Sequence, residues 1–300
     1  MPTSLYPSPH RTSRAALVVA NRPTRTNLRL RAAFAASGLE AAIVPAAQAT
    51  AIARPGDLVL GRLDVLPSLD GAESGVDLLR HLRAAGADVR NGSDTLIACH
   101  DKLSTALILG AAGIRHPRSA YVGAATAPPG LCAPFVVKPR FGSWGRDVQR
   151  CDSTDELTAC LETVAAEPWF ARHGALVQEL IDPRGYDLRI LVAGGEVAGA
   201  IRRTAAPGEW RTNVALGATR HAVDPPLAAR MLAIRAAAAV GADLVGVDLL
   251  PERDGWCVLE LNGAVDFTDD YALDDGDVFD RAVGLLVGVA ERRVAAPVPA

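Results

Sequence analysis

Several signatures that would narrow the function of this 300-residue chain at once are missing from it. Its five cysteines include no C-x-x-C pair, which argues against both a disulfide framework and a zinc site. A formal net charge of −3 argues against binding to nucleic acid by bulk electrostatics. The apolar run 15–20 is too short for a membrane span or a signal-peptide core. We therefore expect a cytoplasmic protein with reduced thiols that binds neither membranes nor nucleic acid.

Two specific nucleotide-binding motifs are missing as well. The chain has no G-x-x-x-x-G-K-[ST] and no G-x-G-x-x-G after its first apolar strand. What remains is an ordinary globular composition, with 49% hydrophobic, 22% charged and 5% aromatic residues. A chain of this length buries a substantial core in one large domain or in two to three small ones.

The first part of the chain alternates short apolar runs with helical patterns. This alternation predicts a small parallel sheet with helices on its faces. The expected strands are 17–20, 39–45 and 57–61, and the expected helices are 26–37 and 75–85.

The remainder predicts a mixed α+β organisation. Its expected helices are 97–112, 154–164, 226–240 and 278–289, and its expected strands are 134–139, 176–181, 186–192 and 196–203, with an extended segment that begins at 121. There is no internal repeat and no long linker. We expect a disordered leader at 1–14, an α/β domain at 15–92, a central unit at 93–175 and a C-terminal unit at 176–300.

A hairpin near the C-terminus gathers oxygen ligands. The apolar runs 245–250 and 256–261 flank a turn-forming connection at 251–255. Side chains alternate along a strand, so Glu260 and Asn262 share a face, and Asp248 lies opposite Glu260 if the turn centres near Asp254. Two carboxylates and an amide oxygen suit Mg²⁺. The alternative is a solvated acidic face.

A lysine and a flexible loop follow one another in the central unit. Lys138 ends the expected strand 134–139, and Gly142, Ser143, Trp144, Gly145 and Arg146 follow it. Small residues let backbone N–H groups approach phosphate oxygens, and a nearby lysine adds positive charge. A single motif of this kind is common, so it is weak when taken alone.

Four arginines crowd the first strand-to-helix connection. Arg22, Arg25, Arg29 and Arg31 either face an acidic ligand or partner or form a solvated helix face.

A set of short motifs follows in a fixed order along the chain. They are Asp101-Lys102, Val137-Lys138, the Gly142–Arg146 loop, Gln178-Glu179-Leu180-Ile181, Asp187-Leu188-Arg189, Arg202-Arg203, Arg211-Thr212-Asn213, Asp248 and Glu260-Leu261-Asn262. This ordered set resembles the RimK-like branch of the ATP-grasp ligases, and within it the LysX-type enzymes, over roughly 17–289. Those enzymes join an amino acid to the C-terminal glutamate of a small amino-group carrier protein.

The resemblance implies an ATP-grasp fold of three sub-domains, mixed α/β and α+β, with ATP held between the central and C-terminal units. Lys102 and Lys138 would contact phosphates, Glu179 and Ile181 would present backbone groups to adenine, and Asp187 would lie near the ribose. Asp248, Glu260 and Asn262 would hold Mg²⁺, with Mn²⁺ as an alternative metal. The remaining implied ATP-binding residues are Gly142, Ser143, Trp144, Gly145, Gln178, Leu180, Arg211 and Asn213.

The implied reaction forms an amide through an acylphosphate. Lys138, Arg203 and Arg211 are the expected catalytic residues, because lysine and guanidinium groups offset the developing charge on phosphate and carboxylate. For the arginines, the alternative is an ordinary surface salt bridge. Gly142 and Gly145 would be the flexible points of a loop that excludes water. The expected substrate-binding residues are Arg189, Arg202, Asn213, Gly263 and Asp266.

The resemblance also implies partners. We expect an amino acid substrate, glutamate or a related one, a small acidic carrier protein or peptide ending in Glu, and a homodimer or homotetramer. One alternative is a ligase of two free small substrates. Another is an ATP-binding regulatory protein without catalysis, although the retention of Lys138, Asp248, Glu260 and Asn262 together argues against it.

The segment after Asn262 departs from the family pattern. Small residues, Gly263 and Ala264, stand where a polar pair is expected, and an acidic stretch follows from Asp266 onward. We expect this region to border the incoming amine, with Asp266 receiving an amino group of the substrate. The alternative is a solvated acidic loop before the last helix.

Overall fold

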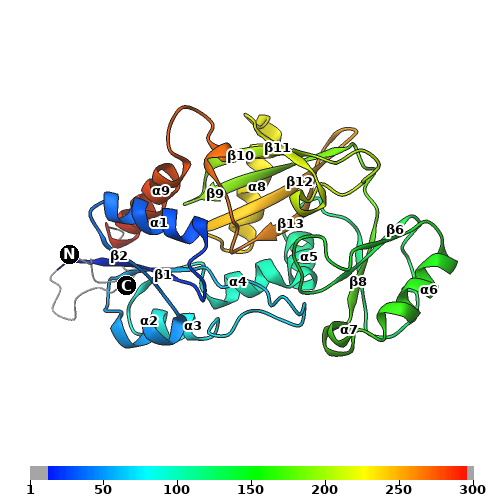
Figure 1. The fold of residues 1–300 in the computed structure, drawn as a ribbon, viewed down its shortest axis with the longest axis horizontal. Coiled ribbons are helices and arrows are strands. Elements are labelled where there is room, and N and C mark those ends of the chain that lie inside the picture. Colours follow the sequence, from blue (N-terminus) through cyan, green and yellow to red (C-terminus); the bar gives the residue numbers. More distant parts are fainter. Residues whose placement is uncertain (1–12, 296–300) are drawn as a thin grey trace.

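The structure, a computed structural model, describes residues 13–295, with side chains described up to residue 288. The expected leader at 1–14 therefore lies almost wholly outside the described residues. Three sheets divide the described chain into an N-terminal, a central and a C-terminal unit (Figure 1). The predicted mixture of α/β and α+β units is confirmed.

The N-terminal unit is a parallel sheet with strand order β2-β1-β3-β4. Strand β1 is buried along its whole length, as a parallel strand covered on both faces requires. The elements are β1 (Ala15–Val19), α1 (Arg25–Ala36), β2 (Glu40–Val44), α2 (Ala46–Ile52), β3 (Leu58–Gly61), α3 (Leu78–Ala84) and β4 (Asp88–Arg90).

The single helix expected at 97–112 is wrong. The structure has two helices, α4 (Ser93–His100) and α5 (Lys102–Ala111), which meet at Asp101. The Asp101 carboxylate accepts hydrogen bonds from the Leu103 N–H at 3.1 Å and the Ser104 hydroxyl at 2.8 Å, and so caps α5. The helical spacing of apolar residues continues across the break, which conceals it in the sequence.

The central unit is an antiparallel sheet with strand order β5-β8-β6-β7. Its last strand, β8, pairs with β5 and β6, so this sheet extends past the expected boundary at residue 175. The elements are β5 (Ser119–Val122), β6 (Phe135–Pro139), β7 (Gln149–Cys151), α6 (Thr154–Val164), α7 (Pro168–His173) and β8 (Ala175–Glu179).

The C-terminal unit is a five-stranded antiparallel sheet with strand order β11-β10-β9-β12-β13. Its elements are β9 (Tyr186–Ala193), β10 (Glu196–Thr204), η1 (Val214–Leu216), β11 (Thr219–Ala222), α8 (Leu227–Ala239), β12 (Leu244–Glu252), β13 (Gly255–Asn262), η2 (Asp269–Tyr271) and α9 (Val278–Ala295).

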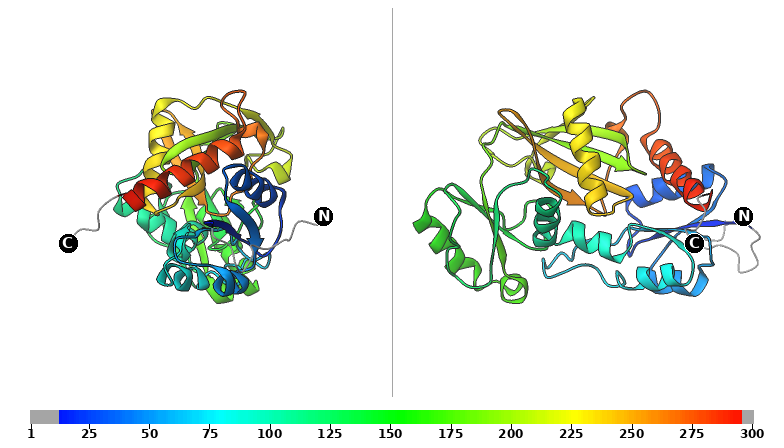
Figure 2. Two further views of the ribbon diagram at one scale, coloured as in Figure 1. Left: turned by 90° about the vertical axis from the view of Figure 1, so that its left-hand side faces the viewer. Right: turned by 180° about the vertical axis from the view of Figure 1, so that it is seen from behind.

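Two apolar cores hold the C-terminal sheet between the other elements. On one face, Leu191 shares a core with Phe34 of α1 and Phe279 of α9. On the other face, Val247 shares a core with Ala233 of α8 and Leu109 of α5. Helix α9 lies beside α1, as both views of Figure 2 show, so the end of the described chain ties the N-terminal unit to the C-terminal sheet.

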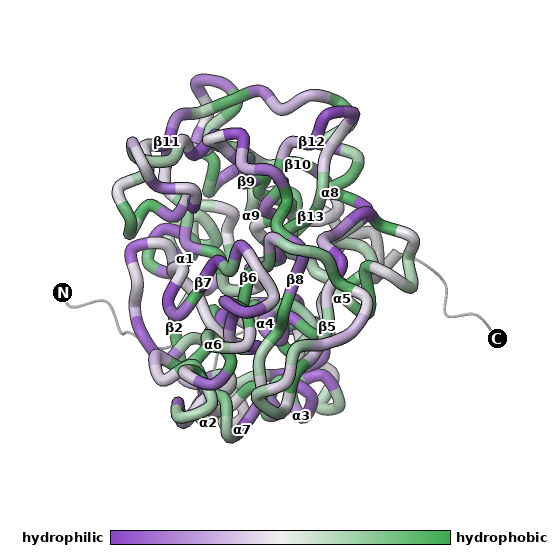
Figure 3. Tube along the Cα trace, turned by 90° about the vertical axis from the view of Figure 1, so that its right-hand side faces the viewer, coloured by the Kyte–Doolittle hydropathy of each residue, from purple (hydrophilic) through white to green (hydrophobic). Residues whose placement is uncertain are grey.

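The sequence analysis did not predict several of the shortest elements. The strands β4, β7 and β11 and the helices α2 and α7 were not expected, because three to seven residues give too few repeats of a period to detect. Figure 3 shows why the longer elements were found, since hydrophobic and hydrophilic stretches alternate along the chain. Within residues 13–295, no helix combines the length and apolar character needed to cross a lipid bilayer.

Candidate active site

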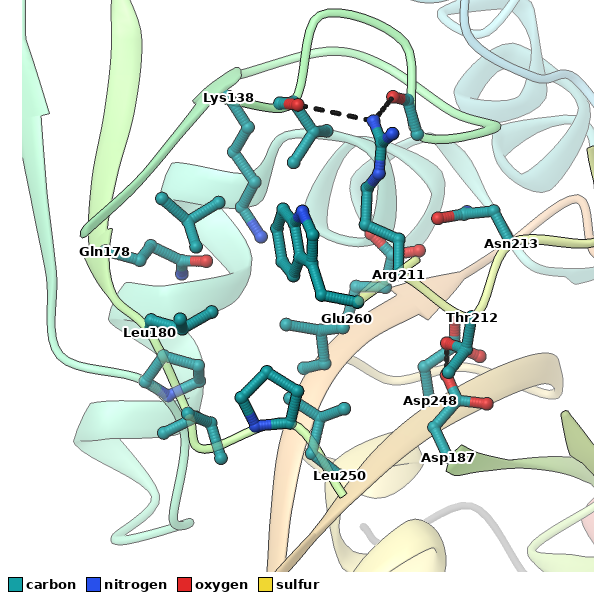
Figure 4. A pocket seen from close by; sticks show the side chains of 18 of the residues that line it. Lys138, Gln178, Leu180, Asp187, Arg211, Thr212, Asn213, Asp248, Leu250 and Glu260 are labelled. Carbon is teal, nitrogen blue, oxygen red and sulfur yellow. Dashed lines mark hydrogen bonds between the residues drawn. The ribbon is translucent and has the colours of Figure 1, made fainter. Parts of the chain in front are cut away.

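The first of three neighbouring pockets lies between the central and C-terminal sheets. The loop Gly142–Arg146, which we call the phosphate loop, lines it, and we call the cavity the phosphate-loop pocket. All thirteen residues expected to bind ATP contribute to its lining. In Figure 4, Lys138 and Gln178 lie on one side of this pocket, Asp187 and Asp248 on the other, and Glu260 between them. The structure thus gathers into one cavity residues that are spread over more than 150 positions of the chain, from Lys102 to Glu260.

The two lysines of this pocket, Lys102 and Lys138, are the two lysines of the whole chain. Strand β6 carries Lys138 into the interior, where its side chain is 5% exposed. Burial lowers the pKa of Lys138 to about 8, although the nearby Glu260 carboxylate opposes this. The Lys102 ammonium donates a hydrogen bond to the Gly142 carbonyl at 2.5 Å and holds the start of the loop.

The loop after β6 has an unusual backbone. Trp144 and Asp147 have φ angles of 65° and 52°, which are costly for residues other than glycine. Gly145 has a φ of 71°, and a Cβ there would stand 2.8 Å from the Asn213 Oδ1 atom. Gly142 has neither constraint. Of the two glycines expected to be flexible points, Gly145 is therefore the one whose position requires glycine.

Arg211 fastens this loop to the C-terminal unit. Its guanidinium donates to the carbonyl oxygens of Gly145 and Val148, each at 3.4 Å, as the dashed lines in Figure 4 show. It also donates to both carboxylate oxygens of Glu209, at 3.0 and 2.8 Å. Hydrogen bonds from Arg211 lower the pKa of Glu209 to about 2. Arg211 is thus placed in the pocket wall, but its charge is already paired.

The proposed adenine side lies at the end of β8. The Glu179 N–H donates to the Arg118 carbonyl at 3.0 Å, and the Leu180 N–H donates to the Pro134 carbonyl at 2.9 Å. Among residues 13–295, no hydrogen-bond partner occupies the Ile181 N–H. The Ile181 backbone is therefore free to pair with a flat heterocycle, as the resemblance implies.

A row of charged side chains, which we call the charge ladder, crosses four strands of the C-terminal sheet on the face of the pocket. The strand register places Arg203 of β10 opposite Asp187 of β9, Arg189 of β9 opposite Asp248 of β12, and Asp248 opposite Glu260 of β13. The predicted pairing of Asp248 with Glu260 is confirmed. Cross-strand neighbours of opposite charge stabilise one another, which accounts for the pairs Arg203–Asp187 and Arg189–Asp248, whereas Asp248 and Glu260 are two carboxylates placed opposite each other.

The centre of the ladder is fully paired. Arg189 makes two hydrogen bonds of 2.6 Å to Asp248, and Arg203 adds a third of 2.8 Å. Burial alone would raise the pKa of Asp248, but the two arginines lower it to about 2. Arg203 and the Thr212 hydroxyl, at 2.6 Å, occupy the fully buried Asp187 carboxylate. The Asp187 carboxylate therefore holds Arg203 in position. Its hydrogen bonds to Arg203 and Thr212 leave the expected contact between Asp187 and a ribose as a prediction that this geometry does not support.

The expected Mg²⁺ ligands fit a metal only in part. Glu260 has no hydrogen-bond partner among the described residues, and the Asn262 amide uses only its nitrogen, in a 3.5 Å contact with the Gly246 carbonyl. Their oxygens are therefore free to bind a hard cation. Both oxygens of Asp248 are taken by arginines, so Asp248 ligates a metal only if one of these contacts gives way. Within residues 13–288, no three His, Cys, Asp or Glu side chains form a metal-binding group.

A second pocket, which we call the arginine pocket, adjoins the first and has a volume of about 250 Å³. Arg25, Arg189, Arg203 and Arg220 line it, with Asp64, Glu260 and Asp266 as its acidic groups. Ser143, Trp144, Arg203, Asn213 and Glu260 line both pockets. The two cavities therefore meet at the phosphate loop and the charge ladder.

Two residues of the arginine pocket carried no sequence signal. His100 is buried at the end of α4, where burial lowers its pKa, and its Nε2 atom lies 2.9 Å from the Leu63 carbonyl oxygen. Tyr271 is buried in η2, and burial raises its pKa. Neither belongs to a motif of fixed spacing, so only the fold brings them to the site.

Only some of the other expected substrate residues line a pocket. Asp266 lines the arginine pocket. Arg202 stacks over the Tyr186 ring at 3.8 Å and lines none of the pockets found among the described residues. Gly263 also lines none of them, because it packs on α4, where a Cβ would lie 3.0 Å from Leu96. The structure therefore does not bring Arg202 or Gly263 to a cavity.

The arginines at and just before the start of α1 have different surroundings. Arg29 pairs with Asp269 and Asp277 of the same chain at 3.0 and 2.7 Å. Arg22 pairs with Glu73 at 3.3 Å, whereas Arg25 lines the arginine pocket. Asp269 and Asp277 of the same chain thus take part of the role that was expected of an acidic ligand or partner protein.

Comparisons with known proteins agree on the family. A model of the RimK-like ATP-grasp domain matches residues 100–272, which is more than half of the chain. A probable alpha-L-glutamate ligase of Shewanella pealeana is 30% identical over 218 residues, or 70% of this chain and 47% of that protein. The chain thus spans about half of the length of this relative.

Two further proteins match this chain. A glutamate–LysW ligase, ArgX, of Sulfurisphaera tokodaii is 33% identical over 193 residues, covering 62% of this chain and 68% of that protein. The ATP-grasp ligase PsnB, solved with a variant of its minimal precursor, Mg and ADP, is 20% identical with a TM-score of 0.65. That match covers 93% of this chain and 99% of the solved one, and it shows the shared fold.

Proposed function

The chain belongs to the RimK-like ATP-grasp family, and from this we propose that it is an ATP-dependent carboxylate–amine ligase. It transfers the γ-phosphoryl group of ATP to a carboxylate, giving ADP and an acylphosphate, and an amine then displaces phosphate to give an amide. We propose an amino acid, glutamate or a related one, as the amine. The carboxylate is then the C-terminal one of a small acidic carrier protein or peptide.

One observation carries this proposal: the phosphate-loop pocket and the arginine pocket share Arg203, Glu260 and the tip of the phosphate loop. A ligase of this kind needs the terminal phosphate of ATP and a carboxylate to meet in one place away from water. The shared wall is the part of the described chain where a phosphate held by lysines faces arginines that fit a carboxylate.

The residues of the two pockets divide the work by charge. Lys102 and Lys138 bind phosphate oxygens, and the phosphate loop covers them. Arg25, which has no ion-pair partner among the described residues, attracts the carboxylate substrate into the arginine pocket, whose wall also contains Arg189 and Arg220, each paired with an aspartate. Arg203 and Arg189, fixed by Asp248 and Asp187, stabilise the negative charge that develops on the phosphoryl group. Arg211 acts as a positioning residue, because its hydrogen bonds hold the loop.

A divalent metal would be held by the free oxygens of Glu260 and Asn262, with Asp248 joining if an arginine withdraws. Bound there, Mg²⁺ would neutralise charge on the phosphates of ATP. We propose that Mn²⁺ can replace it, since both metals accept carboxylate, carbonyl and water oxygens.

The macromolecular context is also a proposal. The ArgX relative is named for its carrier protein, LysW, and PsnB was solved with its precursor, so a carrier or peptide ending in Glu is the favoured acceptor. We propose a cytoplasmic homodimer or homotetramer, which light scattering during gel filtration would test. A ligase of two free small substrates is the second candidate, favoured by the small volume of the arginine pocket, about 250 Å³.

The test is ADP release with Mg-ATP and each of the twenty amino acids, with and without a carrier protein or peptide ending in Glu. The Glu260→Ala variant is the control for contaminating ATPases. Release that requires one amino acid together with the carrier establishes the leading proposal. Release with amino acids alone favours the free-substrate ligase, whereas ATP binding without release under any condition contradicts both.

A further inference from the structure

A third pocket, which we call the strand-edge pocket, lies where the parallel sheet of the N-terminal unit meets the C-terminal unit. It has a volume of about 160 Å³ and is lined by Asn21, Arg22, Arg62, Asp64, Glu73 and Asp266 among others. Asn21 and Arg22 follow β1, and Arg62 and Asp64 follow β3. In parallel α/β sheets, ligands bind outside the carboxyl ends of the strands, which is where this pocket lies.

Arg62 is the unusual residue of the strand-edge pocket. Its side chain is 2% exposed, yet it has few partners. Its Nε atom donates to the amide oxygen of Asn27 at 3.0 Å, and Nη2 reaches the Asp266 carboxylate at 3.4 Å. Among the described residues, the buried Nη1 atom has no hydrogen-bond partner. Burial lowers the pKa of Arg62, and the nearby Asp266 and Asp64 carboxylates oppose this shift only in part.

The carboxylates of the pocket are only partly neutralised. Arg22 pairs with Glu73 at 3.3 Å, which leaves Arg62 to face Asp64 and Asp266. The side chain of Asp266 is 46% exposed, and its other contact is the Thr24 hydroxyl at 3.3 Å. Asp64 accepts from the N–H of Val65 at 2.7 Å and lies 3.9 Å from the imidazole of His100. The pocket thus offers one guanidinium and two carboxylates within a small volume.

This charge pattern fits a zwitterion. A carboxylate beside Arg62 would give this buried guanidinium a second anionic partner in addition to its 3.4 Å contact with Asp266. An ammonium group beside Asp266 and Asp64 would pair with their carboxylates. A chain end with two carboxylates fits worse, because it would face Asp64 and Asp266. It suits the arginine pocket, where Arg25 has no ion-pair partner among the described residues.

We propose that the strand-edge pocket binds the α-carboxylate and α-ammonium groups of the amino acid substrate, with Arg62 as the residue that recognises the carboxylate. This inference rests on the proposed ligase function. The strand-edge and arginine pockets share Asp64, Trp144, Ala264 and Asp266, so an ammonium group at Asp266 stands at their junction. Trp144 of the phosphate loop lines all three pockets and therefore lies between ATP and the amino acid.

The experiment compares ligands that differ in one charged group. The probe is the amino acid that supports the fastest ADP release by the wild-type protein, together with its α-amide and its N-acetyl derivative. The α-amide is assayed as a substrate, and the N-acetyl derivative as a competitive inhibitor. The variants are Arg62→Met, Arg62→Lys and Asp266→Asn. Arg80→Met is the matched control, because Arg80 is an exposed arginine of the same unit that pairs with Asp94.

Charged hydrogen bonds of this kind change affinity by about 10- to 100-fold. We expect the wild-type protein to bind the α-amide at least about 10-fold more weakly than the amino acid. Arg62→Met raises the KM for the amino acid by a similar factor, accepts the α-amide almost equally and leaves the KM for ATP within about twofold. Arg62→Lys restores part of the discrimination, and Arg80→Met behaves as wild type.

Asp266→Asn provides a second, independent test of the proposal, which can be carried out even if Arg62→Met does not fold. This variant should lose discrimination against the N-acetyl derivative and keep discrimination against the α-amide. Equal binding of the amino acid and its α-amide by the wild-type protein overturns the inference, and so does full discrimination by Arg62→Met. In both cases amino-acid-dependent ADP release still supports the ligase. ADP release that needs no amino acid overturns the proposed function and this inference together.

Discussion

Two buried arginines of equal exposure, Arg203 in the charge ladder and Arg62 in the strand-edge pocket, stand in opposite electrostatic conditions. Each has 4% of its surface exposed. Arg203 contacts two carboxylates, Asp187 and Asp248, whereas Arg62 contacts an amide and one half-exposed carboxylate and leaves Nη1 without a partner. A buried charge is tolerated when it is paired. The carboxylates of the protein itself neutralise the charge of Arg203, whereas we propose that a bound ligand neutralises the charge of Arg62.

The same contrast separates the two sides of the site. On the nucleotide side, the register of neighbouring strands fixes the charge ladder and leaves the Glu260 carboxylate without a hydrogen-bond partner among the described residues, while Lys138 enters from the central sheet and Lys102 holds the Gly142 carbonyl. On the amino acid side, the charges come from two units that are joined only by tertiary packing. The nucleotide side should therefore be essential and rigid, and the amino acid side tunable.

Removing Glu260 should have the largest effect on activity. Glu260→Ala takes away the free carboxylate shared by the phosphate-loop and arginine pockets, and we expect ADP release to fall by about 10²- to 10³-fold. Glu252→Ala is the control, because Glu252 lies on β12 of the same hairpin and pairs with Arg115. Equal losses in both variants would show that the effect is structural and would remove Glu260 from the site.

Substitutions in the two arginine environments should change the free energy of unfolding by different amounts. Asp248→Asn leaves Arg189 without its carboxylate partner and Arg203 with Asp187 alone, and we expect it to lower the free energy of unfolding by about 3–5 kcal/mol. Arg62→Met removes a charge that is poorly compensated, and we expect it to be neutral or stabilising, within about 1 kcal/mol. Urea denaturation at pH 7 measures both. Similar destabilisation in the two variants would contradict the comparison.

The pH dependence of stability gives the sign of the Asp248 effect. The folded-state pKa of Asp248 is lowered to about 2, below its usual value of about 3.9. Its contribution to stability is therefore present above about pH 4 and is lost as the pH falls towards 2. This part of the acid dependence should be absent from Asp248→Asn.

The two lysines allow a direct measurement on the nucleotide side. Protein labelled with ¹³C-lysine should give two sets of side-chain NMR signals, from Lys102 and Lys138. The Lys138 signal should titrate with a pKa of about 8 and should move to higher pKa when Mg-ATP binds. Because Lys138 loses its charge above pH 8, kcat/KM for ATP should fall there, by up to about tenfold per pH unit, as one protonation governs it. Lys138→Arg should abolish this fall, since arginine keeps its charge.

The phosphate loop should show the smallest effect. Gly145→Ala places a methyl group against Asn213 at a residue with positive φ, and we expect kcat to fall by about tenfold. Gly142→Ala meets only ordinary contacts and should stay within about twofold. Single-turnover kinetics with both variants would measure loop closure, and equal rates would contradict the distinction between the two glycines.

The parts predicted from the sequence are those with a local period or motif. Alternation along β12 and β13 gave the pairing of Asp248 with Glu260, and the Gly142–Arg146 loop was recognisable by composition. The same alternation would have placed Arg202 and Arg203 on opposite faces of β10, as the structure shows, so the expectation for Arg202 overlooked an available signal.

The remaining parts have no local signal. Arg62 and Asp266 are 204 positions apart, and only the docking of the N-terminal unit against the C-terminal sheet brings them together. The break at Asp101 is hidden because both helices bury apolar faces with continuous spacing. The pairing of Asp248 with two arginines depends on the order of strands in the sheet, which spacing along the chain does not reveal.

The central claim is that ATP and a carboxylate react across the wall shared by the phosphate-loop and arginine pockets. The most direct test uses a peptide ending in Glu with ¹⁸O in its carboxylates, followed by mass spectrometry of the phosphate released. An acylphosphate route transfers one ¹⁸O atom from the carboxylate to each inorganic phosphate as the amide forms. The structure predicts this transfer. Unlabelled phosphate, whose new oxygen comes from water, or ¹⁸O in AMP would contradict the account.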